Sequence, residues 1–349
     1  MPDNEYYKNN SINLNNRLKE LIKELPDFCA DFFMGIESTT SPLTRLNYAY
    51  DLRVFFNFAV TELADYRGKN IKDITISDFN ALETTHFELY LNYLTYYNKN
   101  DDIIENHNTG KARKISALKS FSKYYYKKEQ IDANKIALID SPSIKEKTIV
   151  RLEPDEIANL IDASESGDTL SKKQQSYHAK TQKRDTAILT LFLGTGIRVS
   201  ELVGLNINDV DFKSNAFNVT RKGGNQVTLY FGSEVKSALF EYLEERKAVI
   251  AETGSENALF LSLQKKRLTQ RSIQNLVKKY SKTVTPLKNI TPHKLRSTYG
   301  TRLYQESGDI YLVADVLGHK DVNTTRKHYA AMSEEKRRLA AKIIKLRDE

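Results

Sequence analysis

The sequence has little of what builds disulfide-linked or membrane-embedded proteins. It contains one cysteine, Cys29, which excludes an intramolecular disulfide and fits a reduced cytoplasmic compartment. No apolar run approaches the ~20 residues that a helix needs to cross a membrane. The leading segment, Met1 to Leu14, is polar and lacks the apolar core of a signal peptide. We therefore expect a cytoplasmic protein without a membrane span.

Positive charge is present in excess. The 349 residues include 53 Lys and Arg against 45 Asp and Glu, which gives a formal net charge of +8. Hydrophobic residues make up 40% of the chain, enough to build cores, and the length favours two domains. The charge favours a polyanionic partner without naming it. A soluble protein that is merely basic is the equal alternative at this point.

The pattern along the chain divides it into four parts. Residues 1–35 form an N-terminal extension, and residues 36–138 carry helical periodicity typical of a small all-helical domain. Residues 139–150 contain Ser-Pro-Ser and mixed charge, which indicates a linker. Residues 151–349 form a larger domain. The predicted fold class is mainly α, with a small antiparallel β-sheet in the C-terminal domain.

Three helices are predicted in the first domain. One begins at Ser41, and a second is capped by Ser77 and continues to Leu94. Residues 106–110 are typical of a loop, and the third helix covers residues 111–128.

The third helix is strongly basic and holds no acidic residue. Its cations are Lys111, Arg113, Lys114, Lys119, Lys123, Lys127 and Lys128. By itself this pattern fits a solvated basic face over an aromatic core. DNA phosphates would relieve the mutual repulsion of the cations. We predict DNA contacts for Lys111, Arg113, Lys114, Lys119, Lys123 and Lys127.

The second domain begins with a helix that has Pro154 near its first turn. Residues 164–184 are polar and indicate a loop or a poorly ordered excursion, and Ala187 to Leu193 is a buried apolar helix. Ala216 to Arg221 and Gln226 to Phe231 form a predicted hairpin around a Lys-Gly-Gly-Asn turn.

The first chemical motif is Gly194 to Leu202, where two glycines separate a buried helix from a new one. Arg198 and Glu201 are three apart and share a helix face. An ordinary surface ion pair would explain this spacing. An arginine next to a buried helix, however, needs an acidic partner or a phosphate.

The second motif is Thr291 to Arg296. Thr291 is a suitable N-cap and Pro292 a suitable first helical residue, so His293 and Arg296 would share the first helical turn. Backbone N–H groups and the positive end of the helix dipole favour a phosphate there. Accidental spacing is the alternative.

The third motif joins residues 316–320, Val-Leu-Gly-His-Lys, to residues 324–329, which end in His-Tyr. His293, His319 and His328 are of a ligand type that zinc accepts, but no Cys or carboxylate completes a ligand spacing, so no zinc site is expected.

Taken together, the three motifs resemble the tyrosine recombinase (phage integrase) family. The catalytic resemblance covers about residues 150–349, and Ser41 to Lys128 resembles the family's helical core-binding domain. Val219 to Gly224 and the polar insertion before Lys183 look most like Xer recombinases of the XerS type, which act without a second recombinase. The implied fold is a two-domain DNA-breaking-rejoining enzyme with an N-terminal helical (SAM-like) domain.

The resemblance implies a role for each matching position. Tyr329 would be the nucleophile that forms a 3′-phosphotyrosine, and Glu201 an acidic support residue. The phosphate-activating set would be Arg198, Lys222, His293, Arg296 and His319. No metal, ATP or other cofactor is expected, because side-chain cations supply the charge and the phosphotyrosine keeps the bond energy for rejoining.

The resemblance also implies partners. These are double-stranded DNA at a palindrome-like site and three further copies of the chain, in a homo-tetramer on two duplexes. A division-linked DNA translocase is a further candidate that the residues do not derive. A C-terminal helix carrying Leu339, Ile343 and Leu346 would dock on its own domain or on a neighbouring protomer.

Two positions depart from the usual Xer pattern. Ser297 stands where Xer proteins usually carry histidine, and His319 and Tyr329 are ten apart, a spacing frequent in integrases of mobile elements. Resolution of chromosome or plasmid dimers and mobile-element integration therefore both stay open.

Three other functions are compatible with a basic chain of this kind. A type IB topoisomerase has a similar catalytic set, but the helical domain before the catalytic one argues against it. A noncatalytic DNA-binding regulator would have lost a catalytic position, and none is lost. A basic RNA-binding protein would leave Tyr329 unexplained and lacks glycine-aromatic RNA motifs.

Overall fold

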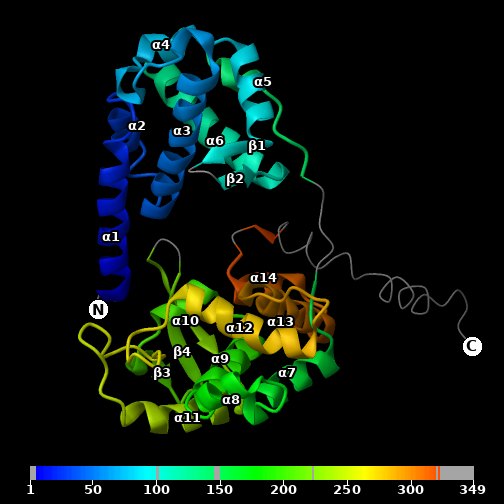
Figure 1. Cartoon of the computed structure of the whole chain (residues 1–349). Coiled ribbons are helices and arrows are strands. Elements are labelled where there is room, and N and C mark those ends of the chain that lie inside the picture. The colour runs from blue at the N-terminus through cyan, green and yellow to red at the C-terminus, as the bar shows by residue number, and fades with distance from the viewer. Residues whose placement is uncertain (1–4, 100–101, 145–149, 222–223, 320, 323–349) are drawn as a thin grey trace, which may run out of the picture. The chain divides into compact units, whose positions relative to one another are not determined.

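The computed structural model describes residues 5–99, 102–144, 150–221, 224–319 and 321–322. The chain forms two compact units, residues 1–147 and 148–349, and both are mainly helical (Figure 1). The second unit carries the predicted small antiparallel sheet, and the first unit, which was expected to be all-helical, carries a short antiparallel pair of strands as well. Within the described ranges, no helix combines the length and the apolarity that crossing a membrane demands.

The first unit consists of helices and one pair of short strands. Its helices are α1 (Glu5–Ile22), α2 (Cys29–Gly35), α3 (Pro42–Glu62), α4 (Ile76–Ala81), α5 (Thr84–Tyr93) and α6 (Asn108–Lys127). Three 3-10 turns lie at Ala64–Tyr66, Ile71–Asp73 and Lys135–Leu138. Strands β1 (Tyr96–Lys99) and β2 (Asp102–Glu105) pair antiparallel.

An aromatic core holds this unit together. Phe55 and Phe56 of α3 and Phe121 of α6 are fully buried and lie within edge-to-face contact of other rings. The leading segment packs on the same core, because Leu18 of α1 and Phe32 of α2 are buried in it. Burying a large apolar side chain contributes about 1.5–3 kcal/mol, so α1 and α2 add stability to the unit.

The helix predicted from Ser77 to Leu94 is in fact two helices. Thr75, not Ser77, is the N-cap of α4, because its Oγ1 accepts from the Asp78 N–H at 3.2 Å while Asp78 accepts from the Thr75 N–H at 2.8 Å. This reciprocal pair fixes the start of the helix two residues earlier. The chain leaves helical geometry at Leu82, and α5 begins at Thr84.

The predicted loop at residues 106–110 is also shorter than expected. Helix α6 begins at Asn108, so residues 108–110 are helical. Asn106 ends the strand pair instead: its amide donates to the Leu94 carbonyl at 2.9 Å, and its backbone N–H donates to Thr95. The β1–β2 pair had no counterpart in the sequence-based prediction.

The second unit surrounds a buried helix with other helices and a three-stranded sheet. Its helices are α7 (Pro154–Ser166), α8 (Lys172–His178), α9 (Gln182–Thr195), α10 (Val199–Gly204), α11 (Ser233–Lys247), α12 (Gln270–Val284), α13 (Pro292–Ser307) and α14 (Ile310–Leu317). The sheet order is β3 (Val210–Asp211), β4 (Ala216–Thr220) and β5 (Gln226–Tyr230), after a 3-10 turn at Ile207–Asp209. Helices α7, α11 and α13 pack against α9 (Figure 1).

Several local predictions for this unit are confirmed. Pro154 lies in the first turn of α7, and β4 and β5 form the predicted hairpin. Their register pairs Val219 with Val227 and Thr220 with Gln226, which brings the ends of the two strands together at the turn.

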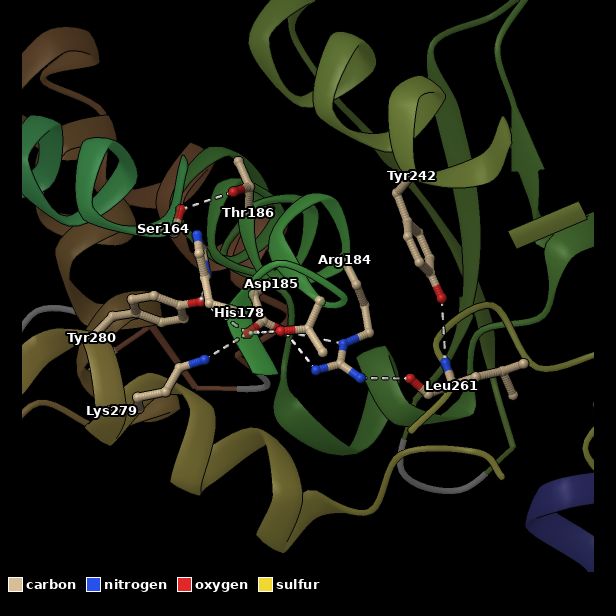
Figure 2. A network of polar contacts seen from close by, with 10 residues as sticks. Ser164, His178, Arg184, Asp185, Thr186, Tyr242, Leu261, Lys279 and Tyr280 are labelled. Atoms are coloured by element: carbon tan, nitrogen blue, oxygen red, sulfur yellow. Dashed lines mark hydrogen bonds and ion pairs between the residues drawn. The ribbon is translucent and has the colours of Figure 1, made fainter. Parts of the chain in front are cut away.

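Residues 164–184 are not a loop or a poorly ordered excursion. They contain the end of α7, the whole of α8 and the start of α9. The buried side chain of His178 holds α8 in place, because its Nδ1 lies 3.0 Å from the hydroxyl of Tyr280 on α12 (Figure 2). The polar residues of this segment have internal partners that their local sequence does not reveal.

The centre of this polar network is the buried carboxylate of Asp185 (Figure 2). Lys279 and Arg184 form ion pairs with it at 2.8 and 2.7 Å, and the Tyr280 hydroxyl donates to it at 2.9 Å. Burial acts to raise the pKa of Asp185, but the two cations outweigh it and hold the pKa below its ordinary value. The network joins the beginning of α9 to α12.

Candidate active site

Helix α14 ends in a way that leaves three carbonyl groups for side chains to satisfy. Gly318 adopts the left-handed conformation, with φ 61°, and its N–H donates to the Asp315 carbonyl at 2.8 Å. The His319 N–H donates to the Ala314 carbonyl at 2.9 Å. This backbone cap satisfies the carbonyls of residues 314 and 315. Among the described residues, no backbone N–H donates to the carbonyls of residues 316, 317 and 318.

Each of these three carbonyls accepts a hydrogen bond from a different arginine. Arg221 Nη2 donates to the carbonyl of residue 316 at 2.9 Å. Arg296 Nη2 donates to the carbonyl of residue 317, and Arg198 Nη2 donates to that of residue 318 at 3.0 Å. The carbonyl end of a helix is partly negative, so it attracts guanidinium groups. Three arginines from three elements therefore converge at one helix end.

Arg198 is held by Glu201 as well as by α14. It is the N-cap of α10, and its backbone N–H and its Nη1 donate to the two carboxylate oxygens of Glu201 at 2.9 and 2.8 Å. Glu201 is only 3% exposed, while the Arg198 side chain is 34% exposed. The predicted pairing is confirmed, and it fixes an arginine that still reaches the surface.

Arg296 is the more deeply buried member of the set. As predicted, Thr291 caps α13, its Oγ1 accepting from the Lys294 N–H at 3.4 Å, and Pro292 lies in the first turn. Arg296 Nη1 donates to the Gly196 carbonyl at 2.5 Å. Gly196 has φ 63°, and a Cβ there would lie 2.4 Å from the Tyr299 ring, so this position requires glycine.

The two described histidines of the predicted set lie at the ends of these same elements. His293 is exposed in the first turn of α13, one turn before Arg296, and its carbonyl accepts from the Ser297 hydroxyl at 3.0 Å. His319 is half-buried and directly follows the Gly318 cap of α14. Lys222 and Tyr329 lie outside the described residues.

Comparison with known proteins decides the family. A model described as the phage integrase family matches residues 150–336, the range that holds all of these motifs. The chain belongs to the phage integrase family of tyrosine recombinases.

Two relatives illustrate how far the similarity of this tyrosine recombinase extends. It is 32% identical to the tyrosine recombinase XerC of Caldanaerobacter subterraneus subsp. tengcongensis, over 82% of this chain and 77% of the relative. It is 29% identical to the tyrosine recombinase XerS of Lactococcus lactis subsp. cremoris, over 92% of this chain and 96% of the relative. Both domains of the recombinase are therefore covered.

Solved structures confirm the fold of the recombinase. The XerH site-specific recombinase bound to its difH substrate matches with a TM-score of 0.61 and 21% identity, over 87% of this chain and 80% of that one. The Tn1549 transposon integrase in complex with circular intermediate DNA matches with a TM-score of 0.65 and 19% identity, over 90% and 98%.

In the first unit, two of the predicted DNA-contacting cations of α6 contact other residues of the same unit. Arg113 forms an ion pair with the buried Asp51, and Lys114 is itself buried and donates to Asn106 Oδ1 at 2.7 Å. Burial raises the pKa of Asp51 to about 6, although Arg113 and Lys114 oppose this rise. Burial also lowers the pKa of Lys114. Lys114 and Asp51 therefore belong to the interior of the recombinase's first unit, whereas Arg113 reaches the buried carboxylate with half of its side chain exposed.

The other cations of α6 differ in how much they are engaged. Lys111 donates to Thr95 Oγ1 at 2.8 Å, and Lys119 donates to the Ile139 carbonyl at 2.6 Å. Lys123 and Lys127 are exposed. Contact with DNA stays a prediction for the whole set, and the last two are the cations best placed to make it.

Arg221 is a site residue that the motifs do not reveal. In the sequence it is only the last residue of a predicted strand, and nothing local distinguishes it from other strand-end cations. Its position directly before Lys222 was the available signal.

Proposed function

We propose that this recombinase cleaves and rejoins DNA at a specific site through a 3′-phosphotyrosine formed by Tyr329. The observation that carries the proposal is the convergence of Arg198 and Arg296 on the end of α14, next to His319. Two fixed guanidinium groups beside a half-buried histidine form a site suited to one phosphodiester group.

The arginines would act on the phosphate in the transition state. There the phosphorus is five-coordinate, and its nonbridging oxygens carry extra negative charge. Arg198 and Arg296 would each hold these oxygens, and donors of this kind are worth about 3–4 kcal/mol each in comparable sites. His319 would add a hydrogen bond to a nonbridging oxygen.

Proton transfer would be divided between two other residues. The Tyr329 phenol has an ordinary pKa of ~10, so it must lose its proton as it attacks, and His293 would accept that proton. The leaving 5′-oxygen would take a proton from Lys222. Side-chain cations supply all the charge that this scheme requires, so it uses no metal ion and no ATP.

We assign the biological role to Xer-like resolution of chromosome or plasmid dimers. The similarity to proteins named XerC and XerS supports this role. The substrate would be double-stranded DNA with a palindrome-like site, bound by four copies of the chain on two duplexes. A chromosomal or plasmid substrate would place the protein in the cytoplasm.

The test is covalent trapping on DNA. A site is first selected from random-sequence duplexes with the wild-type protein, and a nicked version of it then traps the cleaved intermediate. Wild type should form a covalent adduct that survives denaturing electrophoresis. Tyr329→Phe should form none while binding the site with nearly unchanged affinity, because only the attacking hydroxyl is removed. An adduct formed by the Phe variant contradicts the assignment.

A further inference from the structure

Arg221 lies where the hairpin turns. It follows the last residue of β4, its backbone N–H donates to the Asn225 carbonyl at 2.8 Å, and its carbonyl accepts from the Gly224 N–H at 3.0 Å. The backbone at Arg221 is thus fixed by the hairpin itself. The next residue in the sequence is Lys222.

The side chain of Arg221 leaves the hairpin and reaches the end of α14. Its Nη2 donates to the Val316 carbonyl at 2.9 Å, and the guanidinium lies directly against Gly318. A Cβ on Gly318 would lie 2.0 Å from Arg221 Nη1 and 2.3 Å from its Cζ. Both the close approach of Arg221 and the φ of 61° require glycine at position 318, so the guanidinium of Arg221 packs on a site that only glycine leaves open.

This arrangement places one cation close to another. Burial lowers the pKa of Arg221, Glu201 and Asp315 act to raise it, and the charge of Arg198 acts to lower it. A neutral residue at the strand end would avoid the cost of desolvating a charged group. The contact with α14 gives the hairpin a fixed attachment that such a residue would not supply.

We propose that Arg221 is a positioning residue for the recombination reaction. It fastens the β4–β5 hairpin to the end of α14, and so fixes the point of the chain from which Lys222 extends, relative to Gly318 and His319. The inference rests on the proposed function, in which Lys222 protonates the leaving 5′-oxygen.

The test compares two substrates that differ only in the leaving atom. One carries the normal 5′-bridging oxygen, and the other carries a 5′-bridging sulfur, a better leaving group that needs no acid. Arg221→Gln should cleave the oxygen substrate at least ~10-fold more slowly than wild type, because misplacement by about 1 Å can cost ~10²-fold. It should cleave the sulfur substrate at close to the wild-type rate.

Arg221→Lys should lie between wild type and Arg221→Gln, because an ammonium can donate to the Val316 carbonyl but lacks the planar fork that lies on Gly318. Arg271→Gln is the matched control, since Arg271 is an exposed arginine at the start of α12. It should match wild type on both substrates. Thermal unfolding and DNA affinity of every variant are measured in parallel.

Three outcomes overturn the inference. Unchanged cleavage of the oxygen substrate means that the attachment does not matter for the reaction. Equal loss on both substrates with weaker DNA binding means that Arg221 contacts the phosphate itself. Equal loss with a lower unfolding temperature means that its role is only structural.

Lys222→Ala, measured beside these variants, separates this inference from the proposed function. If Lys222→Ala is rescued by sulfur and Arg221→Gln is not, only the role of Arg221 fails. If Lys222→Ala is not rescued by sulfur, Lys222 is not the general acid. The proposed function then fails at that residue, and there is no reason for Arg221 to position it.

Discussion

Arg198 and Arg296 donate hydrogen bonds to consecutive carbonyl oxygens at the end of α14, although one caps α10 and the other lies in α13. The two guanidinium groups are thereby held side by side before any substrate is bound. A helix terminus with partial negative charge acts here as an internal anchor for cations. A phosphate carries a full negative charge and binds guanidinium more strongly than a carbonyl does, so it can compete for the same donors.

Removal of either arginine should slow cleavage without abolishing DNA binding. Arg198→Ala and Arg296→Ala should each lose at least ~10²-fold in the rate of adduct formation, because each removes a donor to transition-state charge. Single-turnover cleavage of the nicked substrate measures the loss, and Arg271→Ala provides the control for charge.

The two variants should differ in stability. Arg296 is buried and satisfies the carbonyls of Gly196 and Leu317, so Arg296→Ala should also lower the unfolding temperature. Arg198 is more exposed, so its replacement should have the smaller thermal effect. A cleavage rate near that of wild type in either variant would remove that arginine from the proposed mechanism.

Electrostatic contact between α6 and DNA should depend on its exposed lysines. Replacing Lys123 and Lys127 together by Gln should reduce the slope of log affinity against log salt by about 0.9 for each lost phosphate contact. Lys119→Gln is the matched comparison, because Lys119 already donates to the Ile139 carbonyl. Fluorescence anisotropy across a salt series gives the slopes. Equal slopes for the double variant and wild type would show that this face of α6 does not meet DNA.

The buried Asp185 should be a major determinant of stability. Asp185→Asn leaves Lys279 and Arg184 near each other without the carboxylate that neutralises them, and loss of one partner in a buried ion pair costs about 3–5 kcal/mol. The unfolding temperature of the second unit should fall by about 6–20 °C. Calorimetry of the full chain measures it.

Asp162→Asn on the exposed face of α7 is the control for Asp185→Asn, and it should change stability by no more than about 0.5 kcal/mol. The pKa of Asp185 is held low, so its stabilising contribution is fully present above the pKa of an unfolded Asp and is lost as the pH falls from there through its lower pKa in the fold. Similar unfolding temperatures for the two Asn variants would contradict a stabilising role for the network.

Asp51 should give the first unit the opposite pH dependence. Its pKa in the fold is raised to about 6 from an ordinary 3.8, mainly by burial, so the folded state binds the proton more tightly than the unfolded state. Its contribution to stability is therefore lost as the pH rises between these two values, by about 3 kcal/mol at most.

Asp51→Asn cannot titrate, so it isolates this effect. The free energy of unfolding of wild type minus that of Asp51→Asn should be larger at about pH 4.5 than at about pH 7. Urea denaturation at both pH values measures the difference. A difference that grows with pH would mean that the ion pair with Arg113, rather than burial, controls the pKa of Asp51.

Much of the local structure and the chemical motifs can be predicted from the sequence. The Thr291-Pro292 start of α13, the Arg198–Glu201 pair and the β4–β5 hairpin depend on residues a few positions apart. Caps, strand alternation and turns are interactions of short range, so the residues that make them are adjacent in the printed sequence.

The failed predictions share a different cause. The polar residues before α9 predict a loop, but the structure gives His178 a partner on α12 that is far away in the sequence. Among the cations of α6, the sequence does not distinguish Lys114, which is buried, from Lys123, which is exposed. The sequence shows how many charged residues a segment has, but not which residues they contact in the fold.

Residue type and short spacing are enough to predict the family, the order of the catalytic motifs, the starts of α3, α7 and α13, and the β4–β5 hairpin. The meeting of Arg198, Arg221 and Arg296 on three successive carbonyls at the end of α14, in contrast, follows from the folded arrangement of the second unit. A guanidinium reaches whichever acceptor the packing of the helices brings within about 3 Å, and that packing depends on the whole core rather than on any local stretch of sequence.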